Sequence, residues 1–181
     1  CALPISAEAA TVTLDRLRTT TLGLQASRPL GPLLLRLEAV TSTRAPLPSV
    51  RFAGTDQRGH APLAGALIGG DLLLGDHFLS LQLGQQRLLR QRSSEPVPPP
   101  QTYVSALWRI AWPGTRLSSE LFAISNLRDG DLYLRPRLAW QASDAWAFGV
   151  GVDAFSGPRS SVFGQFGGRD RLLLDVVWTP G

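Results

Sequence analysis

The sequence has no lysine and no methionine, and it contains one cysteine and two histidines among 181 residues. Cys1 cannot form a disulfide within the chain, so cysteine usage gives no information about the redox compartment. A lipoprotein would carry its acyl groups at such a cysteine, but residues 2–5 (ALPI) do not form a polar tether. The histidines and the cysteine are too far apart for a zinc-binding spacing, and we expect neither a metal nor a cofactor.

Long apolar runs are also missing, since no stretch approaches the roughly 20 apolar residues of a membrane-spanning helix. If a chain with this sequence spans a membrane, it does so with β-strands. The sequence starts with neither an initiator methionine nor a secretory leader that has a basic start and an apolar core. We therefore expect a processed mature form or a fragment.

The 18 basic residues are all arginine, and they are spread along the chain together with 14 acidic residues. No basic block is interleaved with aromatic residues, so we expect no nucleic-acid partner. His77 and Ser80 are three residues apart, which places them on opposite faces of a strand. His60 lies in a loop beside Asp56 and Arg58, the setting of an ordinary solvated histidine. The sequence therefore predicts that the protein is not an enzyme.

The C-terminal part of the chain alternates apolar side chains with small or polar ones. Side chains of a strand alternate between two faces, so the segments 131–141, 146–156 and 169–179 each have one apolar and one polar face. The apolar faces carry Leu132, Leu134, Pro136, Leu138, Trp140, Trp146, Phe148, Val150, Val152, Ala154, Leu172, Leu174, Val176 and Trp178. One face suits hydrocarbon and the other suits water, although a soluble antiparallel sheet with one wet face would alternate in the same way.

The same kind of pattern predicts nine strands and a weaker tenth at the start of the chain. The nine cover residues 19–27, 33–41, 62–70, 77–87, 103–112, 115–125, 131–141, 146–156 and 169–179, and the weak one covers 10–18. Most have about 9–11 residues, the length that a tilted strand needs to cross a bilayer. The predicted fold is all-β, an antiparallel up-and-down transmembrane β-barrel that is either complete or part of a larger barrel.

The predicted connections alternate in length. Residues 28–32, 71–76, 113–114 and 142–145 are short, 126–130 is intermediate, and 42–61, 88–102 and 157–168 are long and rich in proline, glycine, serine or arginine. Outer-membrane barrels have short periplasmic turns and longer external loops. We therefore expect the short turns and the C-terminus to lie in the periplasm.

Four of the five tryptophans fall at one end of the predicted strands. Trp112 precedes a short turn, Trp140 and Trp146 flank another, and Trp178 lies near the C-terminus. All four belong to the apolar face, as expected of an aromatic girdle at the membrane interface. The alternative is that these tryptophans fill a soluble core, which is the commoner environment of tryptophan.

The opposite face is the expected channel lining, and it carries charges of both signs. Its charged residues are Arg36, Glu38, Arg109, Glu120, Arg135, Arg137, Asp153, Arg171 and Asp175. We expect cross-strand pairs between Glu120 and Arg135 or Arg137, and between Asp153 and Arg137 or Arg171. Because arginines outnumber carboxylates in this set, the sequence favours anionic or polar solutes.

Short motifs near both ends of the predicted barrel also occur in a known family. They are Thr21-Leu22-Gly23-Leu24 with Arg36-Leu37-Glu38-Ala39, and residues 155–166 (FSGPRSSVFGQF) followed by Arg169-Asp170-Arg171-Leu172. This sequence resembles proteobacterial outer-membrane porin-like proteins of the alginate-export and DUF1302 type. The resemblance implies a larger barrel of which this chain is the C-terminal part, with passage of small solutes or exported polymer. Such barrels usually end in an aromatic residue that the insertion machinery reads, whereas here Trp178 is the last aromatic residue.

These features predict a porin- or exporter-like passive channel of the bacterial outer membrane. Its expected partners are the lipid bilayer, the barrel-insertion machinery acting on the C-terminal strand, and small solutes. Residues 1–181 are expected to form one β-barrel domain, or the C-terminal portion of one, with an irregular segment at 1–9 followed by strands and loops over 10–181.

Two alternatives remain open at this stage. A soluble or lipid-anchored barrel that binds a hydrophobic ligand inside, as lipocalins do, would invert the two faces. Arg135, Arg137, Asp153 and Asp175 would then lie outside, and the apolar faces would line the cavity. The third interpretation is a barrel with only a structural role in the envelope.

Overall fold

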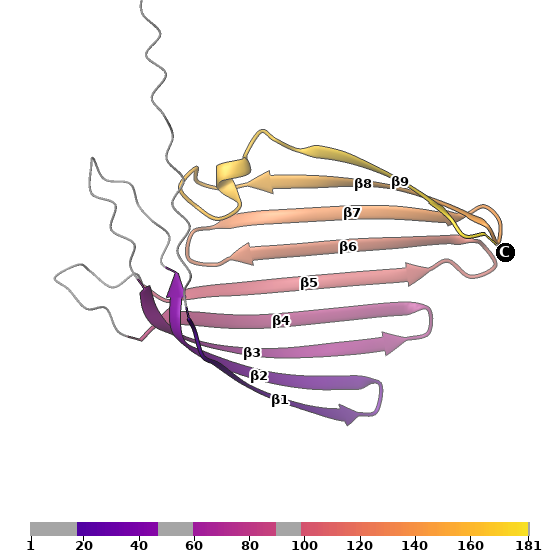
Figure 1. Ribbon diagram of the computed structural model, residues 1–181. Coiled ribbons are helices and arrows are strands. Elements are labelled where there is room, and N and C mark those ends of the chain that lie inside the picture. The colour runs from indigo at the N-terminus through magenta and orange to yellow at the C-terminus, as the bar shows by residue number, and fades with distance from the viewer. Residues whose placement is uncertain (1–17, 47–59, 90–98, 181) are drawn as a thin grey trace, which may run out of the picture.

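The computed structural model describes residues 18–46, 60–89 and 99–180. Within these ranges the chain is all-β, with nine strands in one sheet, each antiparallel to the next and arranged in sequence order (Figure 1). The strands are β1 (Thr21–Leu30), β2 (Leu33–Pro46), β3 (His60–Leu74), β4 (His77–Leu88), β5 (Gln101–Ala111), β6 (Leu117–Asn126), β7 (Asp131–Gln141), β8 (Trp146–Ser156) and β9 (Arg171–Trp178). One short 3₁₀ helix, η1 (Gly164–Phe166), precedes β9. The predicted all-β, up-and-down architecture is confirmed.

The observed strands agree with the predicted ones most closely at the C-terminal end. β7 and β8 have the predicted bounds, whereas β2 and β3 are longer than predicted. β3 continues through residues 71–74, so the connection predicted at 71–76 reduces to a turn at Gly75 and Asp76, with Gly75 at φ 57°. Residues 10–17 of the weak tenth strand lie outside the described part of the chain.

Apart from the turn at 127–130, the connections sort by length to the two ends of the sheet (Figure 1). Residues 31–32, 75–76, 112–116 and 142–145 join strands at one end, where β9 also ends. We call this the short-turn end, and the opposite one the long-loop end. The 157–170 connection with η1 and the tight turn at 127–130 lie at the long-loop end. β1 and β9 are the two edges of the sheet, and both run toward the short-turn end.

The register of the sheet gives it two continuous faces of different chemistry. Residues directly opposite one another on paired strands share a face. One row crosses from β1 to β8 through Ala26, Leu37, Ile68, Leu83, Val104, Ser125, Leu132 and Ser156. The adjacent row, on the other face, passes through Ser27, Arg36, Gly69, Gln82, Ser105, Ile124, Tyr133 and Phe155.

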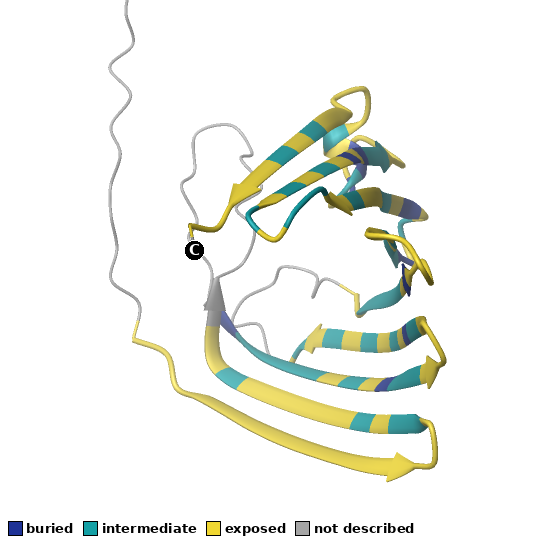
Figure 2. Cartoon of the chain, turned by 90° about the vertical axis from the view of Figure 1, so that its right-hand side faces the viewer, coloured by how far each residue is buried: buried dark blue, intermediate teal, exposed yellow. Residues whose placement is uncertain are grey.

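The sheet curves into an open arc (Figure 2). Large apolar side chains of the face that includes Leu24, Ile68 and Leu174 are exposed. Leu24 is 71% exposed and Leu174 is 74% exposed, whereas the buried hydrophobic residues of the described chain are Ala61 and Ile110. We call the apolar side the outer face and the other side the inner face. The described residues therefore form no hydrophobic core of their own. No helix among them is long and apolar enough to cross a membrane.

The connection between β8 and β9 is packed too tightly for added side-chain atoms. A Cβ at Gly164 would lie 2.1 Å from the Pro158 carbonyl oxygen and 2.6 Å from Ser161 Oγ. Gly157 has φ 126°, which side-chain-bearing residues rarely adopt, and a Cβ there would lie 2.5 Å from the Asp131 Cβ. Both contacts are with groups that cannot move aside easily.

Replacing Gly164 with alanine is expected to destabilise the protein by about 2 kcal/mol or more, because overpacking forces the loop backbone to shift. The matched control is Gly23→Ala in β1, where the nearest atom to the new Cβ lies at 3.9 Å. The control should stay within about 0.5 kcal/mol of the parent. Urea unfolding of micelle-refolded protein measures both variants, and equal midpoints would contradict the tight packing of this loop.

Candidate functional site

The nine residues predicted to line a channel all lie on the inner face. They come from six strands: Arg36 and Glu38 from β2, Arg109 from β5, Glu120 from β6, Arg135 and Arg137 from β7, Asp153 from β8, and Arg171 and Asp175 from β9. The register adds Asp71 of β3, which pairs with Ser80 on this face. Asp71 was not among the predicted channel-lining residues, because residues 71–76 were expected to form a connection between strands.

The charged residues of β5 to β9 are paired across strands. Arg109 Nε donates to Glu120 Oε2 at 2.5 Å, and Arg137 Nη2 donates to Asp175 Oδ2 at 2.5 Å. The second pair reaches over β8 at Gly149, where a Cβ would lie 3.0 Å from Asp175 Oδ2. The partner predicted for Glu120 is therefore wrong. Arg137 does lie opposite Glu120 in register, but the space above Gly149 lets it reach Asp175 instead.

A second cluster joins β7 to β8 near the long-loop end. Asp153, 5% exposed, accepts hydrogen bonds from Tyr133 Oη at 2.7 Å and from Arg135 Nε at 2.8 Å. The partners predicted for Asp153 were Arg137 and Arg171, and both are wrong. Arg171 lies opposite Asp153 in register, but the carboxylate bonds to side chains of β7 instead.

The ion pair of the N-terminal strands is more isolated. Arg36 Nη2 donates to Asp71 Oδ1 at 2.9 Å, and both side chains are largely buried. Arg36 Nε is buried without a hydrogen-bond partner. Asp71 and the nine predicted lining residues together comprise five arginines and five carboxylates.

The four tryptophans predicted to form a girdle lie at the short-turn end. Trp146 stacks on Trp178 with ring centroids 6.1 Å apart, and Phe148 stacks on both Trp140 and Trp146. The register places these rings on the outer face, where all three tryptophans are exposed. They form an exposed aromatic cluster over β7, β8 and β9.

Trp112 and Trp108 extend this arrangement toward β4 and β5. Trp112 Nε1 donates to Ser119 Oγ on the outer face at 2.9 Å. Trp108, the tryptophan that was not assigned to the girdle, stacks on His77 at 6.0 Å and donates to His77 Nδ1 at 3.2 Å. His77 is thus engaged on the outer face, whereas Ser80 lies on the inner face.

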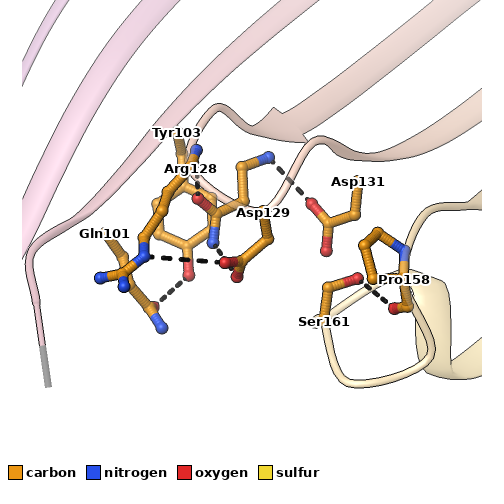
Figure 3. A network of polar contacts seen from close by, with 8 residues as sticks. Gln101, Tyr103, Arg128, Asp129, Asp131, Pro158 and Ser161 are labelled. Atoms are coloured by element: carbon orange, nitrogen blue, oxygen red, sulfur yellow. Dashed lines mark hydrogen bonds and ion pairs between the residues drawn. The ribbon is translucent and has the colours of Figure 1, made fainter.

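Asp131 fixes the loop between β8 and β9 to the turn between β6 and β7, and Figure 3 shows it beside Ser161 and Pro158 of that loop. Its carboxylate, 0% exposed, accepts from the backbone N–H of Asn126 at 3.0 Å and from that of Phe163 at 2.8 Å. Ser161 Oγ donates to the Pro158 carbonyl at 2.8 Å within the same loop. A buried carboxylate with two backbone donors is a strong anchor because its negative charge is satisfied by fixed groups.

Aromatic rings bring this loop onto the inner face. Tyr133 stacks on Phe155 at 5.0 Å and on Phe163 at 5.9 Å, and Phe166 packs against Phe155 at 5.4 Å. Tyr133 and Phe155 belong to the inner face of β7 and β8. The 157–168 loop therefore covers the inner face of these two strands at the long-loop end.

A groove of about 590 Å³ follows the inner face over β1 to β6. Its polar side chains on that face are Gln25, Glu38, Gln82, Gln86, Tyr103 and Ser105, and we call it the amide groove. Gln86 Nε2 donates to Gln101 Oε1 at 3.3 Å, and the Tyr103 hydroxyl donates to the same atom (Figure 3 shows the latter contact).

Comparisons of the chain with known protein families, with curated proteins and with solved structures give no match. Within the described ranges, no three His, Cys, Asp or Glu side chains are grouped closely enough to hold a metal ion. The side chain of His60, and the Asp56 and Arg58 that were considered with it, lie outside the described residues.

Replacing Asp131 with alanine is expected to release the 157–168 loop, because two buried backbone N–H groups lose their acceptor. Amide hydrogen exchange over residues 158–166 should accelerate by about tenfold or more, as followed by mass spectrometry of micelle-refolded protein. Asp144→Ala, in the exposed turn after β7, is the control and should leave this exchange unchanged. Equal exchange in the two variants would show that Asp131 does not anchor the loop.

Proposed function

We propose that this chain forms the wall of an outer-membrane β-barrel and acts as a passive channel for small polar solutes. One observation carries the proposal: over nine strands, the outer face is apolar and exposed, whereas the concave inner face carries the cross-strand ion pairs. An apolar face of this extent is too costly to leave in water and matches hydrocarbon.

The backbone arrangement supports the same proposal. In a bilayer every backbone N–H and C=O needs a partner, and eight successive antiparallel ladders supply partners to all strands except along the edges of β1 and β9. Strand lengths of 8 to 15 residues suit a bilayer crossing. The tryptophans at the short-turn end lie where an interfacial girdle would be.

The orientation of the faces argues against the ligand-binding soluble barrel. In that interpretation Leu132, Phe148 and Leu174 would line a cavity, but these side chains lie on the exposed outer face. Arg135 and Asp153 would lie outside, whereas they face inward here. A barrel with a purely structural role has the same faces, and conductance separates it from a channel. The porin-like resemblance and the passage of exported polymer remain part of the proposal.

The predicted preference for anions depended on an excess of arginines over carboxylates. Asp71 removes that excess, and four of the five arginines form ion pairs with Asp71, Glu120, Asp153 or Asp175. Paired charges of opposite sign present little net field to a passing ion. We therefore propose polar solutes in general, without a strong charge preference.

Adjacent residues at the centre of β5 test which face meets lipid. Ala106 lies on the outer face and Ser105 on the inner face. Ala106→Arg should destabilise the micelle- or vesicle-folded protein by about 2–4 kcal/mol, because a charge near the bilayer midplane is costly. Ser105→Arg should cost less than about 1 kcal/mol, because an inner-face charge stays in water.

Refolding of each variant with and without micelles, followed by circular dichroism and heat-modified gel mobility, provides the measurement. The parent should form heat-modifiable β structure only with micelles. The soluble-barrel alternative predicts the opposite result, with equal β structure in plain buffer and Ser105→Arg as the damaging change.

The Arg36–Asp71 pair tests the charge balance of the channel. Asp71→Asn leaves an uncompensated positive charge, and Arg36→Gln leaves an uncompensated negative charge. The reversal potential across a salt gradient in a planar bilayer should shift toward anion preference in the first variant and toward cation preference in the second. Shifts in the same direction, or no shift in either, would contradict the balance proposed for the inner face.

A further inference from the structure

The inner face has two parts that differ in chemistry. Over β5 to β9 its polar groups are mostly charged, and the pairs Arg109–Glu120, Arg135–Asp153 and Arg137–Asp175 satisfy one another. Over β1 to β5, the inner face carries the Arg36–Asp71 pair, and the polar side chains of the amide groove are amides and hydroxyls, with Glu38 as the one charged residue among those that line it. A solute therefore meets different recognition groups on the two parts.

The charged part is also the more obstructed one. The 157–168 loop is fixed by Asp131 and packs its Phe163 and Phe166 rings against Tyr133 and Phe155. These contacts cover the inner face of β7 and β8 at the long-loop end. The amide groove lies on the other strands of the sheet, away from this loop.

The floor of the amide groove is low because glycines alternate with the polar residues. Gly65 and Gly84 lie on the inner face between longer side chains, and a Cβ at Gly65 would already meet Val40 Cγ1 at 3.3 Å. The groove has a volume of about 590 Å³, and the apolar side chains of Val40, Leu67 and Ile124 line it together with the polar ones. A volume of this size lies within the range typical of small-molecule sites.

The hydrogen bonds of the groove are of a kind that hydroxyl groups can replace. Ser105 Oγ donates to Gln82 Oε1 at 3.3 Å, and Gln86 Nε2 donates to Gln101 Oε1 at 3.3 Å. Each glutamine amide offers two donors and an acceptor, so it can bond to a hydroxyl as donor and as acceptor. The Tyr103 ring adds an apolar surface, and the Glu38 carboxylate accepts from hydroxyls but repels anions.

We propose that the amide groove is a binding site for uncharged, hydroxyl-rich solutes, that is, for neutral saccharides. This assignment deepens the proposed channel function and rests on it. The charged pairs of β5 to β9 then serve the structure of the wall, and the solute passes along β2, β3, β4 and β5.

The test is single-channel recording with the full chain, in which maltohexaose is added as a neutral probe. Binding in the groove should block the current transiently. The double variant Gln82→Leu/Gln86→Leu should weaken the block by about tenfold or more, since two amides that would bond to the sugar are removed. The matched control is Gln141→Leu at the end of β7, outside the amide groove, where the side chain donates to the Ser143 carbonyl oxygen at 2.7 Å, and it should leave the block unchanged.

A size-matched anionic probe, an oligogalacturonate, completes the experiment. Weaker block by the anion than by maltohexaose supports the proposal. Equal block by both probes, or equal loss in the control and the double variant, overturns it. If the chain gives no current, the channel function fails, and equilibrium dialysis of maltohexaose against micelle-refolded protein then tests the groove alone. Binding that depends on Gln82 and Gln86 would keep the saccharide site, and its absence would remove it.

Discussion

Hydrogen bonds between neighbouring strands, rather than an internal hydrophobic core, hold this sheet together. Eight antiparallel ladders join the nine strands, while Ala61 and Ile110 are the buried hydrophobic residues of the described chain. Such a ladder fixes the register, and a slip of one residue would move every side chain of a strand to the other face. The separation of an apolar outer face from a polar inner face follows from this one constraint. In the proposed bilayer, contact between lipid and the outer face would stabilise the sheet, whereas in most proteins an internal hydrophobic core does so.

The accuracy of the sequence predictions follows the regularity of the local pattern. β7 and β8 were predicted with correct bounds because apolar and polar residues alternate strictly there, and turn residues stop both strands. β3 was predicted to end at Gly70 because an aspartate after two glycines is typical of a turn, whereas β4 pairs with β3 through Leu74. The face of each charged residue followed from its position in a strand, but its partner did not. The arginine that pairs with Glu120 or Asp153 depends on the free space around the side chains, such as the space above Gly149. The sequence pattern does not show where that space lies.

Asp131 could not have been singled out from its place in the chain. It begins β7, where an aspartate is an ordinary strand start, and its second backbone donor comes from Phe163 in a distant loop. The amide groove could not have been predicted from the sequence either, because the residues that line it come from six strands, β1 to β6. The inner face thus combines a strand pattern visible in the sequence with contacts that exist only after the strands are aligned. The strand pattern supports the proposed membrane insertion. The contacts between aligned strands support the proposed selection among solutes.

Because β1 and β9 run in the same direction, they limit the number of strands that a closed barrel built from this sheet can have. Both edge strands run toward the short-turn end, because an odd number of strands alternates in direction. Joining them directly would create one parallel seam in an otherwise antiparallel cylinder. Two copies placed side by side in the same orientation would meet through the same seam. An all-antiparallel cylinder that contains these nine strands needs an odd number of additional ones, and its total strand count is therefore even.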